Sequence, residues 1–91
     1  MTKEYTVKFS GKADKALSKM DPFDKRIIVK WVEDRLEGCE DPRRYGKGLE
    51  GNLPGRWRYR VGSWRLLAHI YDDIVLIQIF EIGRRDKIYK R

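Results

Sequence analysis

Residues 56–82 read RWRYRVGSWRLLAHIYDDIVLIQIFEI, three runs rich in aromatic and branched side chains that only Gly62-Ser63 and Asp72-Asp73 separate. Within each run apolar and polar residues largely alternate, which is typical of strands with one buried face. Gly62-Ser63 suits a two-residue type II′ turn, because glycine accepts the positive φ that this turn requires. The stretch therefore predicts a three-stranded antiparallel meander, with strands at 56–61, 64–71 and 74–82.

The register of this meander follows from its first turn. Pairing outward from Gly62-Ser63 places Arg60 opposite Arg65 and Arg58 opposite Leu67, so the three arginines share one face. The other face is apolar and forms the expected core, with Trp57, Tyr59, Val61, Leu66, Ala68, Ile70, Val75, Ile77 and Ile79. Glu81 also falls on this apolar side by simple alternation, where a carboxylate is unfavourable without a partner.

The residues before the meander predict a strand and a helical hairpin. Residues 4–9 alternate like a strand, and a short helix is expected over 11–19. Asp21-Pro22 ends it and begins a second helix, because aspartate caps a helix and proline fits its first position. Two apolar rows at four-residue spacing run along the second helix: Phe23, Ile27 and Trp31, and Ile28, Val32 and Leu36. We expect one α+β domain over 1–91, with the N-terminal strand and hairpin packed on one face of an antiparallel sheet.

Composition excludes several classes of protein. The longest apolar run, 74–80, is interrupted by Gln78 and is far shorter than the roughly 20 residues of a membrane helix. The N-terminus lacks the apolar region of a signal peptide, so a cytoplasmic protein is expected. Cys39 is the only cysteine and cannot form an internal disulfide, and no Cys/His set has zinc spacing. No metal and no cofactor are expected.

The positive charge is concentrated toward the C-terminus. The chain carries a net charge of +7, with twelve Lys/Arg against ten Asp/Glu in residues 1–55, and nine against four in 56–91. Facing like charges such as Arg60 and Arg65 destabilise a strand pair by up to about 1 kcal/mol, so their position calls for a reason. An arginine cluster suits a phosphodiester, because its planar fork of donors matches phosphate oxygens. A solvated basic face is the alternative.

Three segments follow one another in the C-terminal half: LEGNLPG at 49–55, WRYRVGSWRL at 57–66, and IGRR at 82–85 followed by Ile88-Tyr89. In this order and spacing they resemble the RelE branch of the RelE/ParE toxin superfamily, and the resemblance covers nearly the whole chain. It implies a toxin of a type II toxin-antitoxin system, with two N-terminal helices on an antiparallel sheet. RelE toxins enter the ribosomal A site and cut messenger RNA, leaving a 2′,3′-cyclic phosphate.

The resemblance also implies site residues. Arg65, Arg85 and Tyr89 match the family's catalytic positions, and the expected RNA-binding residues are Arg58, Arg60, Arg84, Lys87 and Lys47. Arginine cannot take the proton of the attacking 2′-OH, so Tyr89 is the first candidate base, with Lys87 and His69 as alternatives. Arg84 stands where relatives often have histidine, which leaves the acid for the leaving group unassigned. No metal takes part in the expected reaction.

The resemblance further implies partners and rival functions. The expected partners are a RelB-like antitoxin covering the basic face, the ribosomal A site with its messenger RNA, and operator DNA for the toxin-antitoxin complex; no membrane is involved. A ParE-like inhibitor of DNA gyrase would share the fold without nuclease chemistry. A catalytically inactive co-repressor, bound to DNA with its antitoxin, is the other alternative. The arginines and Tyr89 favour the nuclease.

Overall fold

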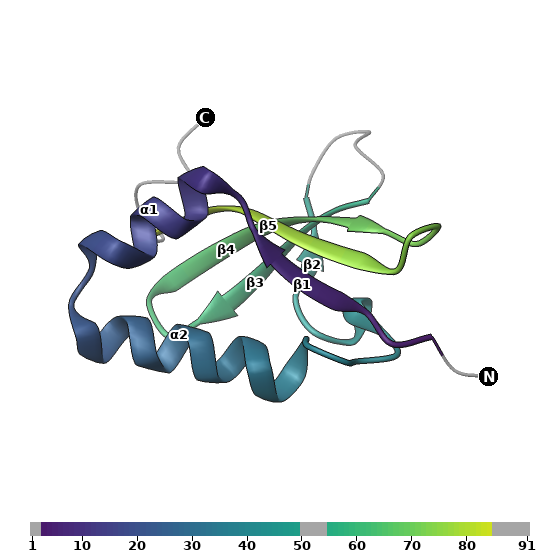
Figure 1. The fold of residues 1–91 in the computed structure, drawn as a ribbon, viewed down its shortest axis with the longest axis horizontal. Helices are drawn as coiled ribbons and strands as arrows, with labels where there is room; N and C mark the ends of the chain where they lie inside the picture. The colour runs from purple at the N-terminus through teal and green to yellow at the C-terminus, as the bar shows by residue number, and fades with distance from the viewer. Residues whose placement is uncertain (1–2, 50–54, 85–91) are drawn as a thin grey trace.

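The structure, a computed structural model, describes residues 3–49 and 55–84. Its elements are β1 (Thr6–Phe9), α1 (Gly11–Lys19), α2 (Pro22–Arg35), the 3₁₀ helix η1 (Pro42–Arg44), β2 (Lys47–Gly48), β3 (Arg56–Val61), β4 (Trp64–Tyr71) and β5 (Leu76–Arg84) (Figure 1). The described part of the chain thus has the predicted α+β fold, with an N-terminal strand and a helical hairpin before the meander; η1 and β2 are additional elements. None of its helices is long and apolar enough to cross a membrane.

Both helices begin where the sequence predicts. The Ser10 hydroxyl accepts a hydrogen bond of 3.1 Å from the Ala13 backbone N–H and caps α1. The Asp21 carboxylate accepts one of 2.8 Å from the Phe23 N–H and caps α2, with Pro22 in the first turn. These caps satisfy N–H groups that have no partner inside the helix.

The sheet has the strand order β1-β5-β4-β3-β2. Its β3–β4 register is the predicted one, with Arg60 opposite Arg65 and Arg58 opposite Leu67, and Gly62 adopts φ +60° in the turn. The sheet is mixed rather than fully antiparallel, because β1 pairs in parallel with β5. A parallel pair needs a long connection between its strands, and the helices together with the other strands provide it.

The second half of the meander differs from the prediction. The reversal after β4 takes in residues 72–75, and β5 begins at Leu76 rather than at residue 74, because Val75 has φ +54° and leaves the extended conformation. A bulge then interrupts the β4–β5 pairing: Ala68 faces Ile79 but Leu67 faces Glu81, which leaves Phe80 as the extra residue.

The bulge corrects the prediction for Glu81. Simple alternation placed its side chain among the core residues, whereas the register places it opposite Leu67, on the face that carries Arg65. Ile82 takes the core position instead and is buried. Glu81 lies 3.6 Å from the Lys12 ammonium, so this carboxylate has a cationic neighbour.

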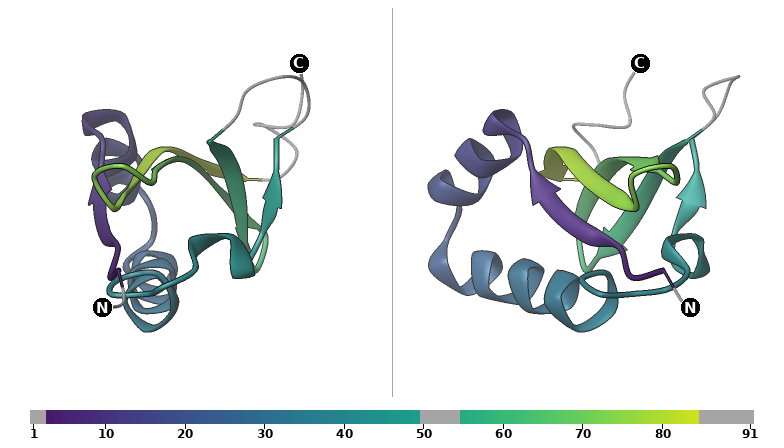
Figure 2. Two further views of the ribbon diagram at one scale, coloured as in Figure 1. Left: turned by 90° about the vertical axis from the view of Figure 1, so that its right-hand side faces the viewer. Right: turned by 45° about the vertical axis from the view of Figure 1, so that its right-hand side comes forward.

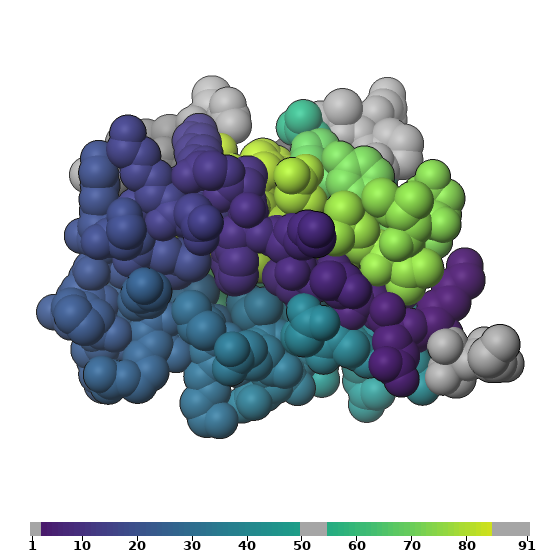
Figure 3. Space-filling model, in the orientation of Figure 1, coloured from purple at the N-terminus to yellow at the C-terminus, as the bar shows by residue number. Residues whose placement is uncertain are grey.

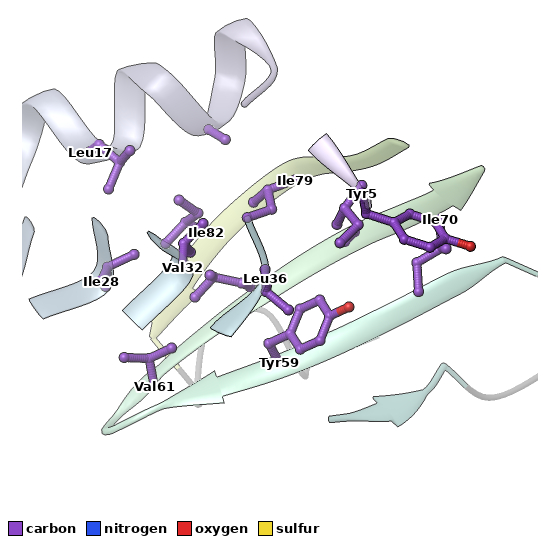
Figure 4. Close-up of a cluster of buried hydrophobic side chains, with 14 residues drawn as sticks. Tyr5, Leu17, Ile28, Val32, Leu36, Tyr59, Val61, Ile70, Ile79 and Ile82 are labelled. Atoms are coloured by element: carbon purple, nitrogen blue, oxygen red, sulfur yellow. The ribbon is translucent and has the colours of Figure 1, made fainter. Parts of the chain in front are cut away.

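The hydrophobic core lies between the helices and one face of the sheet, which curves around α2 (Figure 2). Tyr59, Val61, Ile79 and Ile82 of the sheet face the helices in the core (Figure 4), where Ile28 and Val32 of α2 and its C-cap residue Leu36 are buried. Figure 3 shows that the side chains of α1, β1 and α2 form a continuous surface on the side of the molecule that carries β1.

Only one of the two predicted apolar rows on α2 is core. Phe23 is 61% exposed and Ile27 42% exposed, while Trp31 is half-buried against Tyr45 and Tyr59. The prediction treated both rows as one buried flank. A helix that lies on a sheet buries only the row of side chains that points at the sheet, and the neighbouring row lies at the edge of the contact, where it reaches solvent.

A polar clamp ties η1 to the turn between β4 and β5. The Arg43 guanidinium donates two hydrogen bonds to the Asp72 carboxylate, at 3.0 and 3.1 Å, and the Tyr5 hydroxyl donates a third at 2.6 Å. The Arg43 and Tyr5 donors hold the pKa of Asp72 below its ordinary value. The clamp therefore joins three segments that are distant in sequence.

Candidate functional site

A basic pocket opens on the face of the sheet opposite the helices. It has a volume of about 270 Å³ and is lined by Gly46, Lys47, Arg58, Arg60 and Arg65. Four of these five residues carry a positive charge, and they come from three adjacent strands, β2, β3 and β4. Arg58, Arg60 and Arg65 share this face, as predicted, and Lys47 joins them from the neighbouring strand. The predicted convergence also included Arg85, which lies outside the described residues.

Strand β2 forms one wall of the basic pocket. Lys47 pairs with Arg58 and Gly48 with Trp57. Gly46 enters this strand with φ +77°, and a side chain there would collide with the backbone carbonyl oxygen of Arg58. Glycine is thus required for the close approach of β2 to β3, and this approach sets Lys47 beside Arg58.

The segment before β2 is anchored to the core side of β3. The Tyr59 hydroxyl donates a 2.7 Å hydrogen bond to the Pro42 carbonyl oxygen, and the Trp57 indole N–H donates one of 2.6 Å to the Tyr45 carbonyl oxygen. Sequence reasoning did not predict η1 or β2. The signal was available for η1, because Asp41-Pro42 repeats the Asp21-Pro22 start of α2, and Asp41 caps the Arg43 N–H at 3.1 Å.

Arg65 is the most deeply placed cation of the basic pocket. It is only 5% exposed and is the buried charged residue of the described part of the chain. One of its guanidinium nitrogens donates a 3.2 Å hydrogen bond to the Trp64 carbonyl oxygen. Arg60, directly opposite, is exposed. A charge in a site shielded from water interacts with an anion more strongly than one at the surface, so the basic pocket is suited to a phosphate.

Arg84 lies on the other face of the sheet. It pairs with Trp64, and its guanidinium lies 4.6 Å from the centre of the Trp64 ring, donates a 3.1 Å hydrogen bond to the Ser63 hydroxyl and lies 3.9 Å from Asp24 of α2. The structure thus does not bring Arg84 to the basic pocket. Three further predicted residues, Arg85, Lys87 and Tyr89, lie outside the described residues.

His69 is on the same face as Arg65, as predicted, but four residues farther along β4. Its ring lies 4.5 Å from the Phe80 ring and 5.8 Å from the Tyr71 ring, measured between centres. Burial and the nearby Arg56 charge lower the pKa of His69, so the imidazole is neutral at pH 7. At about 3.3 Å per residue, His69 is roughly 13 Å from Arg65 along the strand.

Residues 3–49 and 55–84 contain no cluster of three His, Cys, Asp or Glu side chains that could hold a metal ion. Four cationic side chains, Lys47, Arg58, Arg60 and Arg65, supply positive charge to the basic pocket. Guanidinium groups remain protonated at all physiological pH values, so they can stabilise an anion but cannot accept a proton.

Comparison with known proteins places this chain in a family. The family described as "ParE toxin of type II toxin-antitoxin system, parDE" matches residues 7–89. Toxin RelG of Mycobacterium tuberculosis is 33% identical over 87 residues, which cover 96% of this chain and 98% of RelG. These matches include the strands that line the basic pocket.

Solved structures agree with these sequence matches. A chain of the toxin-antitoxin complex RelBE2 from M. tuberculosis has a TM-score of 0.79 and 32% identity, covering 93% of this chain and 94% of that one. The isolated E. coli RelE toxin has the same fold, with a TM-score of 0.73, 22% identity, and coverage of 93% and 90%. The chain therefore belongs to the RelE/ParE superfamily of toxins from type II toxin-antitoxin systems.

Proposed function

We propose that this protein is a ribosome-dependent endoribonuclease that enters the ribosomal A site and cuts messenger RNA. The observation that carries the proposal is the basic pocket, where Lys47, Arg58, Arg60 and Arg65 converge on one face of the sheet. Two arginines directly opposite each other cost stability in an isolated sheet. A phosphodiester bound between them would attract both guanidinium groups, which supports a phosphate-binding role.

The proposed reaction is attack of a ribose 2′-OH on the adjacent phosphorus, with departure of the 5′-oxygen and formation of a 2′,3′-cyclic phosphate. Negative charge increases on the phosphate oxygens in the transition state. Cations already aimed at these oxygens lower the barrier, and removing one such group typically costs about 10²–10³ in rate. We assign this role to Arg65 and, from the family resemblance, to Arg85; no metal ion is required.

The 2′-OH proton needs an acceptor, and we propose Tyr89. Its ordinary pKa of about 10 would have to fall beside the arginines for the phenolate to serve as base. Lys87 is the alternative within the same C-terminal segment. His69 is the less favoured alternative, because its backbone lies roughly 13 Å along β4 from that of Arg65 and its ring lies beside Phe80 and Tyr71.

A separate antitoxin is the proposed physiological partner. RelE toxins occur with RelB antitoxins in the RelBE2 complex of M. tuberculosis and in the RelE-RelB complex of Pyrococcus horikoshii. An acidic segment that covers the basic pocket would neutralise its charge and block entry of RNA. Binding of operator DNA by the toxin-antitoxin complex belongs to the same proposal.

Inhibition of DNA gyrase is the second candidate function, because the matching family is described as ParE toxin. One set of assays separates the two functions. Purified toxin is added to ribosomes carrying a defined message, and the 3′ ends are mapped by primer extension; gyrase supercoiling is measured in parallel. We expect cuts within the A-site codon, blocked by a 2′-deoxy nucleotide at the cleaved position, and unchanged supercoiling.

Variants connect this activity to the proposed residues. Arg85→Ala should slow cleavage by roughly 10² or more, and Tyr89→Phe should slow it while binding of the message persists. Arg26→Ala is the matched control, because Arg26 is an exposed arginine on α2, on the other side of the sheet. Intact messages combined with inhibited gyrase would reject the nuclease in favour of the ParE-like function.

A further inference from the structure

Beyond the basic pocket, the same face of the sheet carries a row of planar side chains. The centre of the His69 ring lies 4.5 Å from that of Phe80 and 5.8 Å from that of Tyr71, with ring planes inclined by 34° and 28°. The Arg56 guanidinium lies 5.5 Å from the centre of the Phe80 ring. We call this set the aromatic row: Arg56, His69, Tyr71 and Phe80.

The aromatic row is not part of the core. The buried cluster and the side chains packed against it lie on the helix side, and Phe80, His69 and Tyr71 are absent from both. Phe80 and His69 are half-buried and Tyr71 is 38% exposed, so the row retains surface that solvent can reach. The bulge places Phe80 here, because it is the extra residue of β5 opposite β4.

The aromatic row continues directly from the basic pocket. Arg56 is two residues from Arg58 along β3, and His69 pairs with Arg56 across to β4. The spacing of strand residues, about 3.3 Å each, puts Arg56 roughly 7 Å from Arg58 and His69 roughly 13 Å from Arg65. A short stretch of single-stranded RNA spans such distances with its backbone in the basic pocket.

We propose that the aromatic row binds an unpaired nucleobase of the RNA strand whose phosphate occupies the basic pocket. This rests on the proposed function, because it takes the ligand of the basic pocket to be RNA. Aromatic and guanidinium planes stack on nucleobases without requiring a particular sequence. We choose RNA as the occupant because aromatic rings beside a guanidinium group and a cationic pocket match a base attached to a phosphate backbone. An acidic protein segment is an outcome that the test below separates.

The charges around the aromatic row are compatible with a bound RNA strand, although the Glu81 carboxylate lies on the same face. Glu81 is the acidic residue of β5 on this face, and Lys12 lies 3.6 Å from it. Arg56 places a cation at the end of the row nearer to the basic pocket, where the backbone of the strand would pass. The imidazole of His69 is neutral and presents an uncharged ring for stacking.

The test combines a protein variant with altered RNA. A single-stranded oligonucleotide with 2′-deoxy sugars at the cleavage site carries one abasic nucleotide, moved stepwise away from that site. Its dissociation constant is measured for wild type and Phe80→Leu, both free and on ribosomes programmed with it. Phe80→Leu should bind the intact strand about tenfold more weakly, and one abasic position should weaken wild type but not Phe80→Leu.

Two control variants guard this result against a folding defect. Phe80→Tyr keeps the ring and should bind like wild type. Phe23→Leu makes the same replacement at an exposed phenylalanine of α2 and should change nothing.

Each remaining outcome counts against one proposal. Equal sensitivity of wild type and Phe80→Leu to every abasic position overturns the aromatic row as a base-binding site, even if wild type cuts messages. Weaker binding of the antitoxin alone, with RNA affinity unchanged, also overturns it. If one abasic position weakens RNA binding by wild type but not by Phe80→Leu, and the protein cuts no message, the result would support the aromatic row as a base-binding site and reject the nuclease.

Discussion

Adjacent residues of β4 serve opposite faces of the sheet. Leu66 is fully buried and faces the helices, whereas Arg65 belongs to the basic pocket on the other face. On the helix side, apolar side chains form the core. The Tyr59 hydroxyl and the Trp57 indole N–H on this side both donate hydrogen bonds to backbone carbonyl oxygens. The other side carries the cations of the basic pocket, and two of them, Arg60 and Arg65, lie opposite each other. The contrast supports the proposal that one face maintains the fold and the other binds a ligand.

Leu66→Ala should give the largest effect, and on stability. Truncation of a fully buried leucine removes apolar contacts and leaves a cavity, which typically costs about 2–5 kcal/mol. We expect the midpoint of urea unfolding, followed by circular dichroism, to fall accordingly. A loss below about 1 kcal/mol would mean that the helix side is not the folding face.

Arg65→Gln should have the converse effect. Glutamine retains much of the apolar stem but loses the charge, so we expect single-turnover cleavage of programmed messages to fall by roughly 10² or more. The urea midpoint should change far less than in Leu66→Ala. Arg26→Ala on α2 is the matched control and should cleave like wild type. Equal cleavage by wild type, Arg26→Ala and Arg65→Gln would contradict the division between the two faces.

Tyr59→Phe tests a connection between the faces. Its hydroxyl lies on the core side but holds the Pro42 carbonyl at 2.7 Å, and Pro42 begins the segment that leads to Lys47 in the basic pocket. Loss of this buried hydrogen bond should cost about 1 kcal/mol or somewhat more, because the carbonyl loses its partner. The measurement is urea unfolding. Stability equal to wild type would show that water replaces the hydroxyl without loss.

The sequence predicts correctly which residues lie on which face of the sheet wherever hydrophobic periodicity and turn residues agree. Gly62-Ser63 determined the β3–β4 register, and the caps at Ser10 and Asp21 located both helices. Beyond β4 the local pattern was insufficient. Alternation cannot reveal a bulge, which depends on pairing with another strand, so Glu81 was assigned to the wrong face.

The candidate site was predictable to the same extent. Arg58, Arg60 and Arg65 converge because their register is local. The resemblance implies that Lys47 binds RNA, but the sequence does not predict where Lys47 lies, because a two-residue strand has no periodic pattern. Its position depends on the turn at Gly46 and on the hydrogen bonds of Tyr59 and Trp57. Arg84 turned to the helix side because the bulge also reverses the faces after residue 80.

The smallest expected effect is that of Asp72→Asn, which tests the polar clamp at the edge shared by both faces. Both Arg43 and Asp72 are more than one-third exposed, so solvent screens the pair and the melting temperature should fall by no more than a few degrees at pH 7.

The pH dependence identifies the cause of that loss. Arg43 and Tyr5 hold the pKa of Asp72 below its ordinary value, so the folded protein binds this proton less readily than the unfolded chain. The clamp therefore contributes its full stability above the unfolded pKa of about 3.9 and loses it as pH falls through the lower folded pKa. Melting curves of wild type and Asp72→Asn should differ by a constant amount above about pH 5 and approach each other below about pH 4. A difference that persists at lower pH would point to packing in the turn rather than to the charge of Asp72.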